Sequence, residues 1–265
     1  MLLTYDVGNT NITIGVFGFK KGMPSRTPLH IWRLETDASR SVNAYAAALK
    51  GLLKKAHIAP RSIKAVAVAS VVPPVNKVLK EVNRTLFDVT AVFIEGYTQR
   101  SMRIRYKKPK EVGADRIANA VAARELYGVP SMVIDFGTAT TFDCINARGE
   151  YLGGVIVPGP KLAAAALFEK TARLPRVEII KPRTVIGIST TSSIQSGLYY
   201  GYRGLIKEIL QQLAEDMGAK SSVRVYIEFS CDKELWSTVG VHTNILRASI
   251  EAIEKGFRYY LKTIK

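Results

Sequence analysis

The chain has 265 residues, 47% of them hydrophobic, so it can bury a full core in one large domain or two smaller ones. Its 38 Lys and Arg residues against 22 Asp and Glu give a formal net charge of +16, which suits acidic ligands such as nucleotides. The basic residues are scattered without a long run of interleaved aromatics, so we interpret most of this excess as a solvated surface and do not expect nucleic acid as the partner.

The cysteine spacing and the N-terminal residues indicate in which cellular compartment the protein is found. Cys144 and Cys231 form neither a disulfide framework nor a zinc-binding spacing, which fits a reducing environment. The chain enters an apolar strand directly, without a secretory leader, and no apolar run is long enough to span a bilayer. We therefore expect a cytoplasmic protein without membrane contact.

The first predicted elements are two strands joined by a polar turn. The first strand, 2–7, carries Asp6 near its end, Gly8 opens the bend, and β-branched residues mark a second strand over 12–17. Glycine lets backbone amides approach an anion, and the side chains of 9–11 add donors. Asp6 is placed to hold a hydrated cation beside that anion. The turn predicts a metal–phosphate site, with an ordinary polar hairpin as the alternative.

The next elements complete a β-β-β-α-β-α-β unit. Apolar residues at helical spacing predict the helices, and β-branched runs predict the strands. In chain order we expect a strand over 29–34, a helix over 41–55, a strand over 63–72, a helix over 75–86 and a strand over 91–94. The polar, proline-containing stretch 106–112 then predicts a passage between two domains.

The second half opens with a predicted helix that starts at Ala114 and ends before Gly128. Asp115 and Arg116 fall in its first turn, where the helix dipole stabilises a carboxylate and favours anion contact. The segment 132–145 then repeats the layout of the opening: a strand, an Asp, an apolar residue, a Gly, a polar cluster and another strand.

This repeat predicts a duplicated unit, with domains over 1–112 and 113–265. Two equivalent acidic turns favour a phosphate clamp between the domains over two chance hairpins. The remaining predicted elements are a strand over 151–157, a helix over 161–168, a long helix over 192–217, a strand over 223–229 and a final helix over 243–261.

The order of these motifs resembles that of the type III pantothenate kinases, a family in the superfamily of actin and the sugar kinases. The matching motifs extend to about Tyr202 and are Asp6–Asn11, Ser70–Pro74, Gly113–Arg116, Asp135–Thr140, Gly153–Gly159, Leu174–Val177 and Gln195–Gly197. The resemblance implies an α/β fold of duplicated actin-like (ribonuclease H-like) domains with the active site in the cleft between them. It also implies ATP-dependent phosphorylation of the pantothenate 4′-hydroxyl, the first step of coenzyme A biosynthesis.

The resemblance further implies roles for single residues. Asp115 would be the general base, Asp6 would hold Mg²⁺ and phosphate, and Asp135 would bind a monovalent cation, K⁺ or NH₄⁺. The residues expected to bind ATP are Asp6, Val7, Gly8, Asn9, Thr10, Asn11, Ile12, Thr13 and Thr138. The residues expected to bind pantothenate are Tyr106, Gly113, Ala114, Asp115, Arg116 and Thr190. A homodimer is implied as well.

Each of these residues also has a purely structural alternative. Asp115 could stabilise the first turn of its helix, and Asp135 could stabilise the second hairpin. Tyr106 could be an ordinary aromatic between domains, and Thr190 could be a helix N-cap.

Two segments depart from the family pattern. The usual Gly-Lys-Asn-Thr is replaced by Gly187-Ile188-Ser189-Thr190. A lysine and an amide are therefore missing, which could change contacts with the substrate or at the subunit interface. Glu228–Asp232 lacks the glycine pair of the usual Thr-Gly-Gly turn, and its bulkier side chains could change nucleotide affinity or preference.

Two other functions stay open at the level of sequence. One is a non-catalytic regulatory or nucleic-acid-associated family member, suggested by the net charge and the two departures. The other is a phosphohydrolase, in which water replaces the alcohol. The retention of Asp6, Asp115 and Asp135 favours the kinase.

Overall fold

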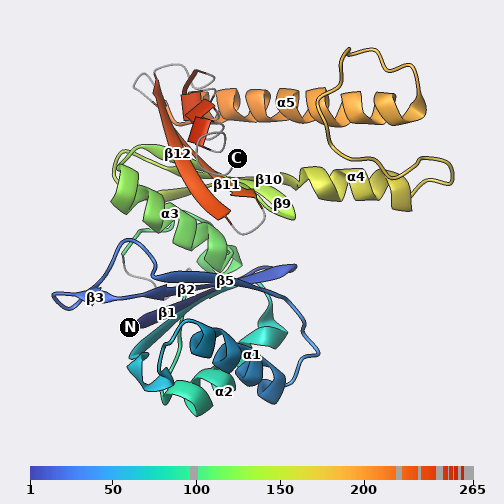
Figure 1. Cartoon of the computed structure of the whole chain (residues 1–265). Coiled ribbons are helices and arrows are strands. Elements are labelled where there is room, and N and C mark those ends of the chain that lie inside the picture. Colours follow the sequence, from blue (N-terminus) through green and yellow to red (C-terminus); the bar gives the residue numbers. More distant parts are fainter. Residues whose placement is uncertain are drawn as a thin grey trace. The chain divides into compact units, whose positions relative to one another are not determined.

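The computed structural model describes residues 1–95, 101–218, 223–231 and 234–242, and helical stretches at 247–249, 251–252, 254–255 and 258–259. The chain forms two compact units, shown in Figure 1. The first consists of Met1–Arg100 with Lys107–Ala118, and the second of Ser101–Tyr106 with Asn119–Lys265. The domain boundary after residue 112 stays a prediction.

The first unit is the predicted β-β-β-α-β-α-β arrangement. Its elements are β1 (Leu2–Val7), β2 (Asn11–Phe17), β5 (His30–Glu35), α1 (Val42–Lys55), β6 (Ala65–Ser70), α2 (Pro73–Phe87) and β7 (Val92–Phe93), with the small strands β3 (Phe19–Lys20) and β4 (Met23–Pro24) and the 3₁₀ turns η1 (Pro60–Ser62) and η2 (Pro109–Glu111). The sheet order is β5-β2-β1-β6-β7. β1 pairs antiparallel with β2 and parallel with β6, so it is the central strand.

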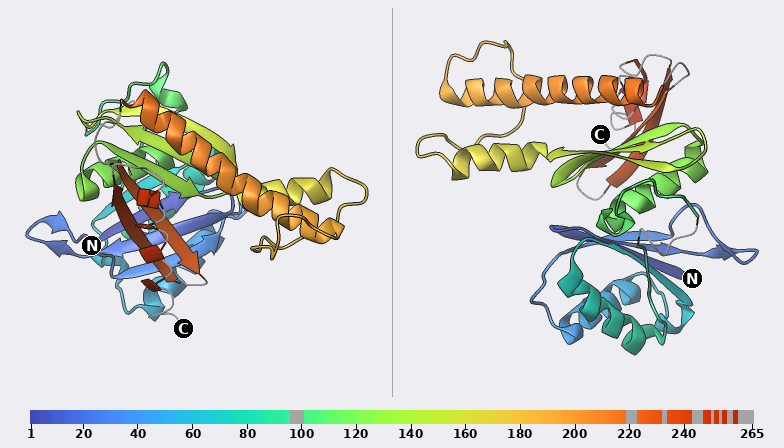
Figure 2. Two further views of the ribbon diagram at one scale, coloured as in Figure 1. Left: turned by 90° about the horizontal axis from the view of Figure 1, so that it is seen from above. Right: turned by 180° about the vertical axis from the view of Figure 1, so that it is seen from behind.

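Alternation along β1 determines which side chains enter the core. Leu3, Tyr5 and Val7 are buried in one cluster with residues of α1 and α2, whereas Asp6 between them is exposed. Both helices cover the same face of this sheet, as the right-hand view of Figure 2 shows. The central strand therefore carries its acidic residue on the face opposite the helices.

Local signals explain where the helices of the first unit begin. Ser41, the first residue of the helix predicted over 41–55, is the N-cap of α1 and accepts a hydrogen bond from the Ala44 N–H at 3.3 Å. α2 begins at Pro73, two residues before the predicted start. Proline fits the first turn of a helix because the amide it lacks would have no partner within the helix there.

A buried polar pair lies inside this core. The Tyr5 hydroxyl donates to Asn83 Oδ1 at 3.0 Å, and Asn83 Nδ2 donates to the Leu79 carbonyl at 2.7 Å. Burial raises the pKa of Tyr5 far above its ordinary value, so the hydroxyl stays protonated as a donor.

The second unit repeats the strand order of the first. Its elements are β8 (Ser131–Phe136), β9 (Ala139–Ile145), β10 (Tyr151–Pro158), α4 (Pro160–Glu169), α5 (Thr190–Asp216), β11 (Val223–Cys231) and β12 (Glu234–His242), and α3 (Ala114–Tyr127) precedes them. The sheet order is β10-β9-β8-β11-β12, and β8 pairs antiparallel with β9 and parallel with β11. This correspondence confirms the duplicated fold class.

The two units differ at the last strand. β7 runs parallel to β6 after the crossing helix α2, whereas β12 runs antiparallel to β11 as a hairpin. The sequence analysis did not predict β12. Much of the helix predicted over 243–261 lies outside the described residues, and the described stretches from 247 onward are helical.

The core of the second unit lies on one face of its sheet. Met132, Ile134 and Phe142 pack there with Leu210 from the second half of α5. The first half of α5 and all of α4 extend beyond the sheet edge, joined by the loop 170–189 (Figure 1). In the described part of the chain, no helix has both the length and the apolarity that crossing a membrane requires.

Candidate active site

The turn between β1 and β2 presents polar groups to solvent. The Gly8 N–H donates to the Asn11 carbonyl at 3.0 Å, and Thr36 Oγ1 donates to the Gly8 carbonyl at 2.7 Å. Asp6, Asn9, Thr10 and Asn11 are all exposed. The turn thus combines a fixed backbone with a carboxylate and several small hydrogen-bonding side chains.

Three more residues predicted to bind ATP flank this turn. Val7 and Ile12 pair across the hairpin with buried side chains, so only their backbone can reach a nucleotide. Thr13 is half-buried and pairs with Asp6, which puts both side chains on the face opposite the core.

The turn between β8 and β9 has the same layout and is more open. The Gly137 N–H donates to the Ala139 carbonyl at 3.0 Å, and Thr138 is exposed. Asp135 accepts a hydrogen bond from Asn119 Nδ2 of α3 at 3.1 Å. Phe136 is 43% exposed, whereas the equivalent Val7 is 1% exposed. The second turn therefore offers an apolar surface beside its polar groups.

A close backbone contact supports the second turn. The Gly159 N–H donates to the Thr138 carbonyl at 2.9 Å, and a Cβ on Gly159 would lie only 2.3 Å from the Gly137 carbonyl oxygen. Gly159 is also the N-cap of α4, so the positive end of that helix adjoins the turn and favours an anion there. The sequence analysis quoted Gly159 within a motif without assigning it this contact.

Asp115 lies in the first turn of α3, half-buried, and its Oδ1 accepts the Arg116 N–H at 2.7 Å. A Cβ on Gly113 would lie 2.4 Å from that Oδ1 and 3.6 Å from Val71 Cγ1. Since the Val71 N–H donates to the Val7 carbonyl at 3.0 Å, Gly113 is close to the sheet edge where β1 and β6 end. Ligands in α/β sheets commonly bind beyond the carboxyl ends of parallel strands.

The other residues predicted to bind pantothenate are found in different settings. Ala114 and Arg116 are buried at the start of α3. Tyr106 is half-buried in the second unit, where its Cε2 lies 3.3 Å from where a Cβ on Gly153 would be. Thr190 is exposed as the first residue of α5.

The structural alternative proposed for Thr190 is wrong. The N-cap of α5 is Ser189, whose Oγ accepts the Ser192 N–H at 3.1 Å, while Ser192 Oγ accepts the Ser189 N–H at 2.9 Å. This reciprocal capping box satisfies the start of the helix without Thr190.

The carboxylates of the two turns suit cations that are held jointly with phosphate. Among the residues that the structure describes, no group of three or more His, Cys, Asp or Glu side chains is arranged to hold a metal ion. Mg²⁺ keeps several waters and is usually bound through one or two carboxylates together with substrate phosphates. The exposed Asp6, beside the hydroxyl and amide groups of its turn, fits that mode.

Residues 2–212 match the family model described as type III pantothenate kinase. The chain belongs to the type III pantothenate kinases. It is 43% identical over 230 residues to the type III pantothenate kinase of Koribacter versatilis. The aligned region covers 84% of this chain and 83% of that protein. The chain is 44% identical over 220 residues to the type III pantothenate kinase of Endomicrobium trichonymphae, covering 83% of this chain and 85% of the relative. These relatives confirm the resemblance inferred from the motifs.

Two other similarities accompany this family match. The Ppx/GppA phosphatase structure from Aquifex aeolicus is similar with a TM-score of 0.41 and 13% identity, covering 80% of this chain and 63% of that one, which is too little to inform function. Residues 210–261 match a model described as the LeuA allosteric (dimerisation) domain. The pantothenate kinase match thus ends within α5, and β11 and β12 lie beyond it.

The segment that lacks the family's glycine pair, Glu228–Asp232, falls in this C-terminal part. β11 ends at Cys231, while residue 232 and the side chains of 228–231 lie outside the described residues. The expected effect of this segment on nucleotide affinity stays a prediction.

Gly159→Ala should destabilise the second turn. The added Cβ would meet backbone atoms of Gly137 and Thr138, which cannot rotate away. We therefore expect the free energy of unfolding to fall by about 1–3 kcal/mol, the cost typical of overpacking. Urea denaturation measures this change. The control is Gly201→Ala, because Gly201 is exposed on α5 and a Cβ there would meet no atom outside its own stretch of helix within 4 Å. Its free energy of unfolding should rise by about 0.5–1 kcal/mol. Unchanged stability in Gly159→Ala would contradict the close contact.

Proposed function

We propose that this protein transfers the γ-phosphoryl group of ATP to the 4′-hydroxyl of pantothenate, the first step of coenzyme A biosynthesis. Membership of the type III pantothenate kinases carries this proposal. The presence of Asp6, Asp115 and Asp135 on the turns and the helix start described above supports it.

The proposed mechanism depends on positioning and charge rather than on covalent chemistry. Asp115 accepts the proton of the substrate hydroxyl as that oxygen attacks phosphorus. The Arg116 amide holds Oδ1 of this carboxylate, and the carboxylate also fills the space beside Gly113. The residues assigned to pantothenate with Asp115 are Tyr106, Gly113, Ala114, Arg116 and Thr190.

The two turns are assigned to ATP and its cations. Residues 6–13 wrap the phosphates through backbone amides and small side chains, and Asp6 contacts hydrated Mg²⁺, which when bound neutralises phosphate charge. Thr138 of the second turn contacts ATP as well. Asp135, oriented by Asn119, is assigned to the monovalent cation, K⁺ or NH₄⁺.

A cytoplasmic location is part of the proposal. The spacing of Cys144 and Cys231 indicates neither a disulfide framework nor a zinc site, which fits a reducing compartment.

The role of Asp115 can be tested without disturbing the fold. Asp115→Asn should lower kcat about 100- to 10,000-fold because the amide cannot accept the proton. In Gly113→Ala the carboxylate must move, since a Cβ would lie 2.4 Å from Oδ1, and kcat should fall about a hundredfold while thermal stability changes little. The measurement is pantothenate-dependent ADP formation with Mg-ATP in K⁺ buffer and again in Na⁺ buffer.

The same assay separates the competing functions. Turnover that requires pantothenate, rises with K⁺ and collapses in Asp115→Asn supports the kinase. ADP released equally without pantothenate would support a phosphohydrolase. The absence of turnover together with salt-dependent DNA retention would support a regulatory, nucleic-acid-associated protein.

We propose further that the protein is a homodimer that associates through the loop joining α4 and α5. This loop exposes a run of large apolar residues, with Ile188 97% exposed and Ile186 and Val185 also exposed. Exposed apolar clusters of this kind mark interaction surfaces. The similarity of residues 210–261 to a domain described as a dimerisation domain is a second, separate indication.

Ile188→Asp should convert the dimer to a monomer because it places a charge in the apolar contact. Light scattering after size exclusion reports the mass of the particle. The matched control is Val92→Asp on β7, which is 67% exposed in the first unit and should leave the dimer intact. A dimer that survives Ile188→Asp would place the interface elsewhere.

A further inference from the structure

A short segment before Tyr106 joins the edge of the second sheet. Ile104 forms a parallel bridge with Tyr151 at the start of β10. The Arg105 N–H donates to the Tyr151 carbonyl at 2.8 Å, and the Tyr151 N–H donates to the Arg103 carbonyl at 2.9 Å. The segment 101–106 therefore belongs to the second unit, although the residues on both sides of it in sequence belong to the first.

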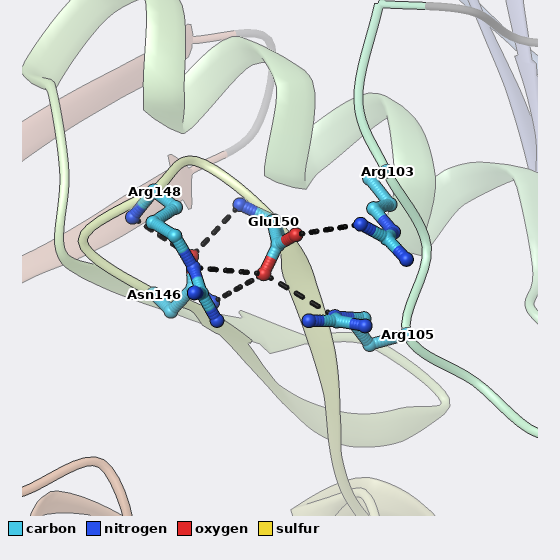
Figure 3. Close-up of polar contacts among 5 residues, drawn as sticks. All are labelled: Arg103, Arg105, Asn146, Arg148 and Glu150. Atoms are coloured by element: carbon cyan, nitrogen blue, oxygen red, sulfur yellow. Dashed lines mark hydrogen bonds and ion pairs between the residues drawn. The ribbon is translucent and has the colours of Figure 1, made fainter.

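The carboxylate of Glu150 holds the arginine side chains of this segment. Glu150 Oε2 lies 3.3 Å from Arg105 Nε and 3.3 Å from Arg148 Nε, and Oε1 lies 3.6 Å from Arg103 Nη1 (Figure 3). Asn146 Nδ2 donates to Oε2 at 2.9 Å. The Glu150 side chain is only 11% exposed, whereas the arginines reach it from the solvent side. Glu150 is thus the common partner of the segment and of the β9–β10 turn.

The groups around Glu150 keep its carboxylate ionised. The hydrogen bond from Asn146 is the largest cause that lowers the pKa of Glu150, and the charges of Arg105 and Arg148 lower it further against the opposing effect of burial. Glu150 is therefore ionised at neutral pH, and protonation would weaken the ion pairs only as the pH falls below the ordinary glutamate value of 4.5.

Tyr106 follows directly after the held residues. Its ring edge lies over Gly153, with Cε2 and Cδ2 at 3.3 and 3.4 Å from where a Cβ would be. Gly153 has φ 118° at a bulge in β10, a backbone conformation that favours glycine. The position of the Tyr106 ring thus depends on the bulge beneath it and on how firmly Arg103 and Arg105 are held beside it.

We propose that Glu150 is a positioning residue for pantothenate: by holding Arg103 and Arg105 it fixes the Tyr106 ring against Gly153. The inference rests on the proposed function, which assigns Tyr106 to the pantothenate pocket. Glu150 does not touch the substrate and acts through the segment alone. Its loss therefore affects pantothenate binding more than ATP binding.

Arg105 and Arg148 provide a matched pair of variants. Both guanidinium groups lie 3.3 Å from the same Glu150 oxygen, so replacing either one removes the same charge from the same carboxylate. Only Arg105 is on the segment that carries Tyr106, because Arg148 is on the turn between β9 and β10. A purely electrostatic or global effect would appear in both variants.

Steady-state kinetics test the consequence for substrate. Glu150→Gln and Arg105→Gln should raise KM for pantothenate about tenfold, with KM for ATP and kcat changed less than about twofold, as expected when binding alone is lost. Arg148→Gln should match the wild type, and Arg105→Lys, which keeps a charge for Glu150, should recover part of the loss. Equal effects of Arg105→Gln and Arg148→Gln, or no effect of either, would overturn the inference.

Hydrogen exchange tests the structural half independently of turnover. A peptide covering 101–106 should exchange faster in Glu150→Gln and Arg105→Gln than in the wild type, and at the wild-type rate in Arg148→Gln. Unchanged exchange in Glu150→Gln would overturn the positioning role. A wild type that forms no ADP with pantothenate would overturn the proposed function, and the assignment of Glu150 to pantothenate with it. An active wild type with unchanged KM in the variants would overturn this inference alone.

Discussion

Each unit depends on a buried central strand that runs antiparallel to one neighbour and parallel to the other. β1 lies between β2 and β6, and β8 lies between β9 and β11. Alternation along β1 gives Leu3, Tyr5 and Val7 to the core and leaves Asp6 on the other face, whereas β8 is buried from Ser131 to Ile134 and Asp135 is half-buried near its end. In β1 a shift of one residue would bury Asp6 and expose the core residues, so core packing determines where this carboxylate lies.

The duplication is retained where the acidic turns are and is lost toward the C-terminus. Strand order and pairing agree from the first hairpin of each unit to the parallel neighbour of the central strand. The crossing helix and parallel last strand of the first unit are then replaced by the β11–β12 hairpin. This change follows the end of the match to the kinase family within α5. Val225 and Ile227 of β11 still complete the core of the second unit.

Much of the fold could be predicted from sequence because its signals are local. Apolar residues at helical spacing predicted α1, and the repeated acidic turns predicted the duplication. β12 was missed because no glycine or asparagine marks a turn between it and the predicted strand before it. The contacts that support the candidate site were also beyond prediction: Gly113 beside Asp115, Gly159 against the second turn and Glu150 with Arg105 depend on backbone paths that sequence spacing does not specify.

The identity of the phosphorylated product tests the central claim most directly. Phosphorus NMR of the purified protein with Mg-ATP and pantothenate separates a phosphomonoester from inorganic phosphate. The account predicts a new phosphomonoester signal, coupled to the methylene protons of the pantothenate 4′-carbon and formed in equal amount to ADP. Inorganic phosphate as the sole new product beside ADP would contradict it, because water rather than pantothenate would then be the acceptor.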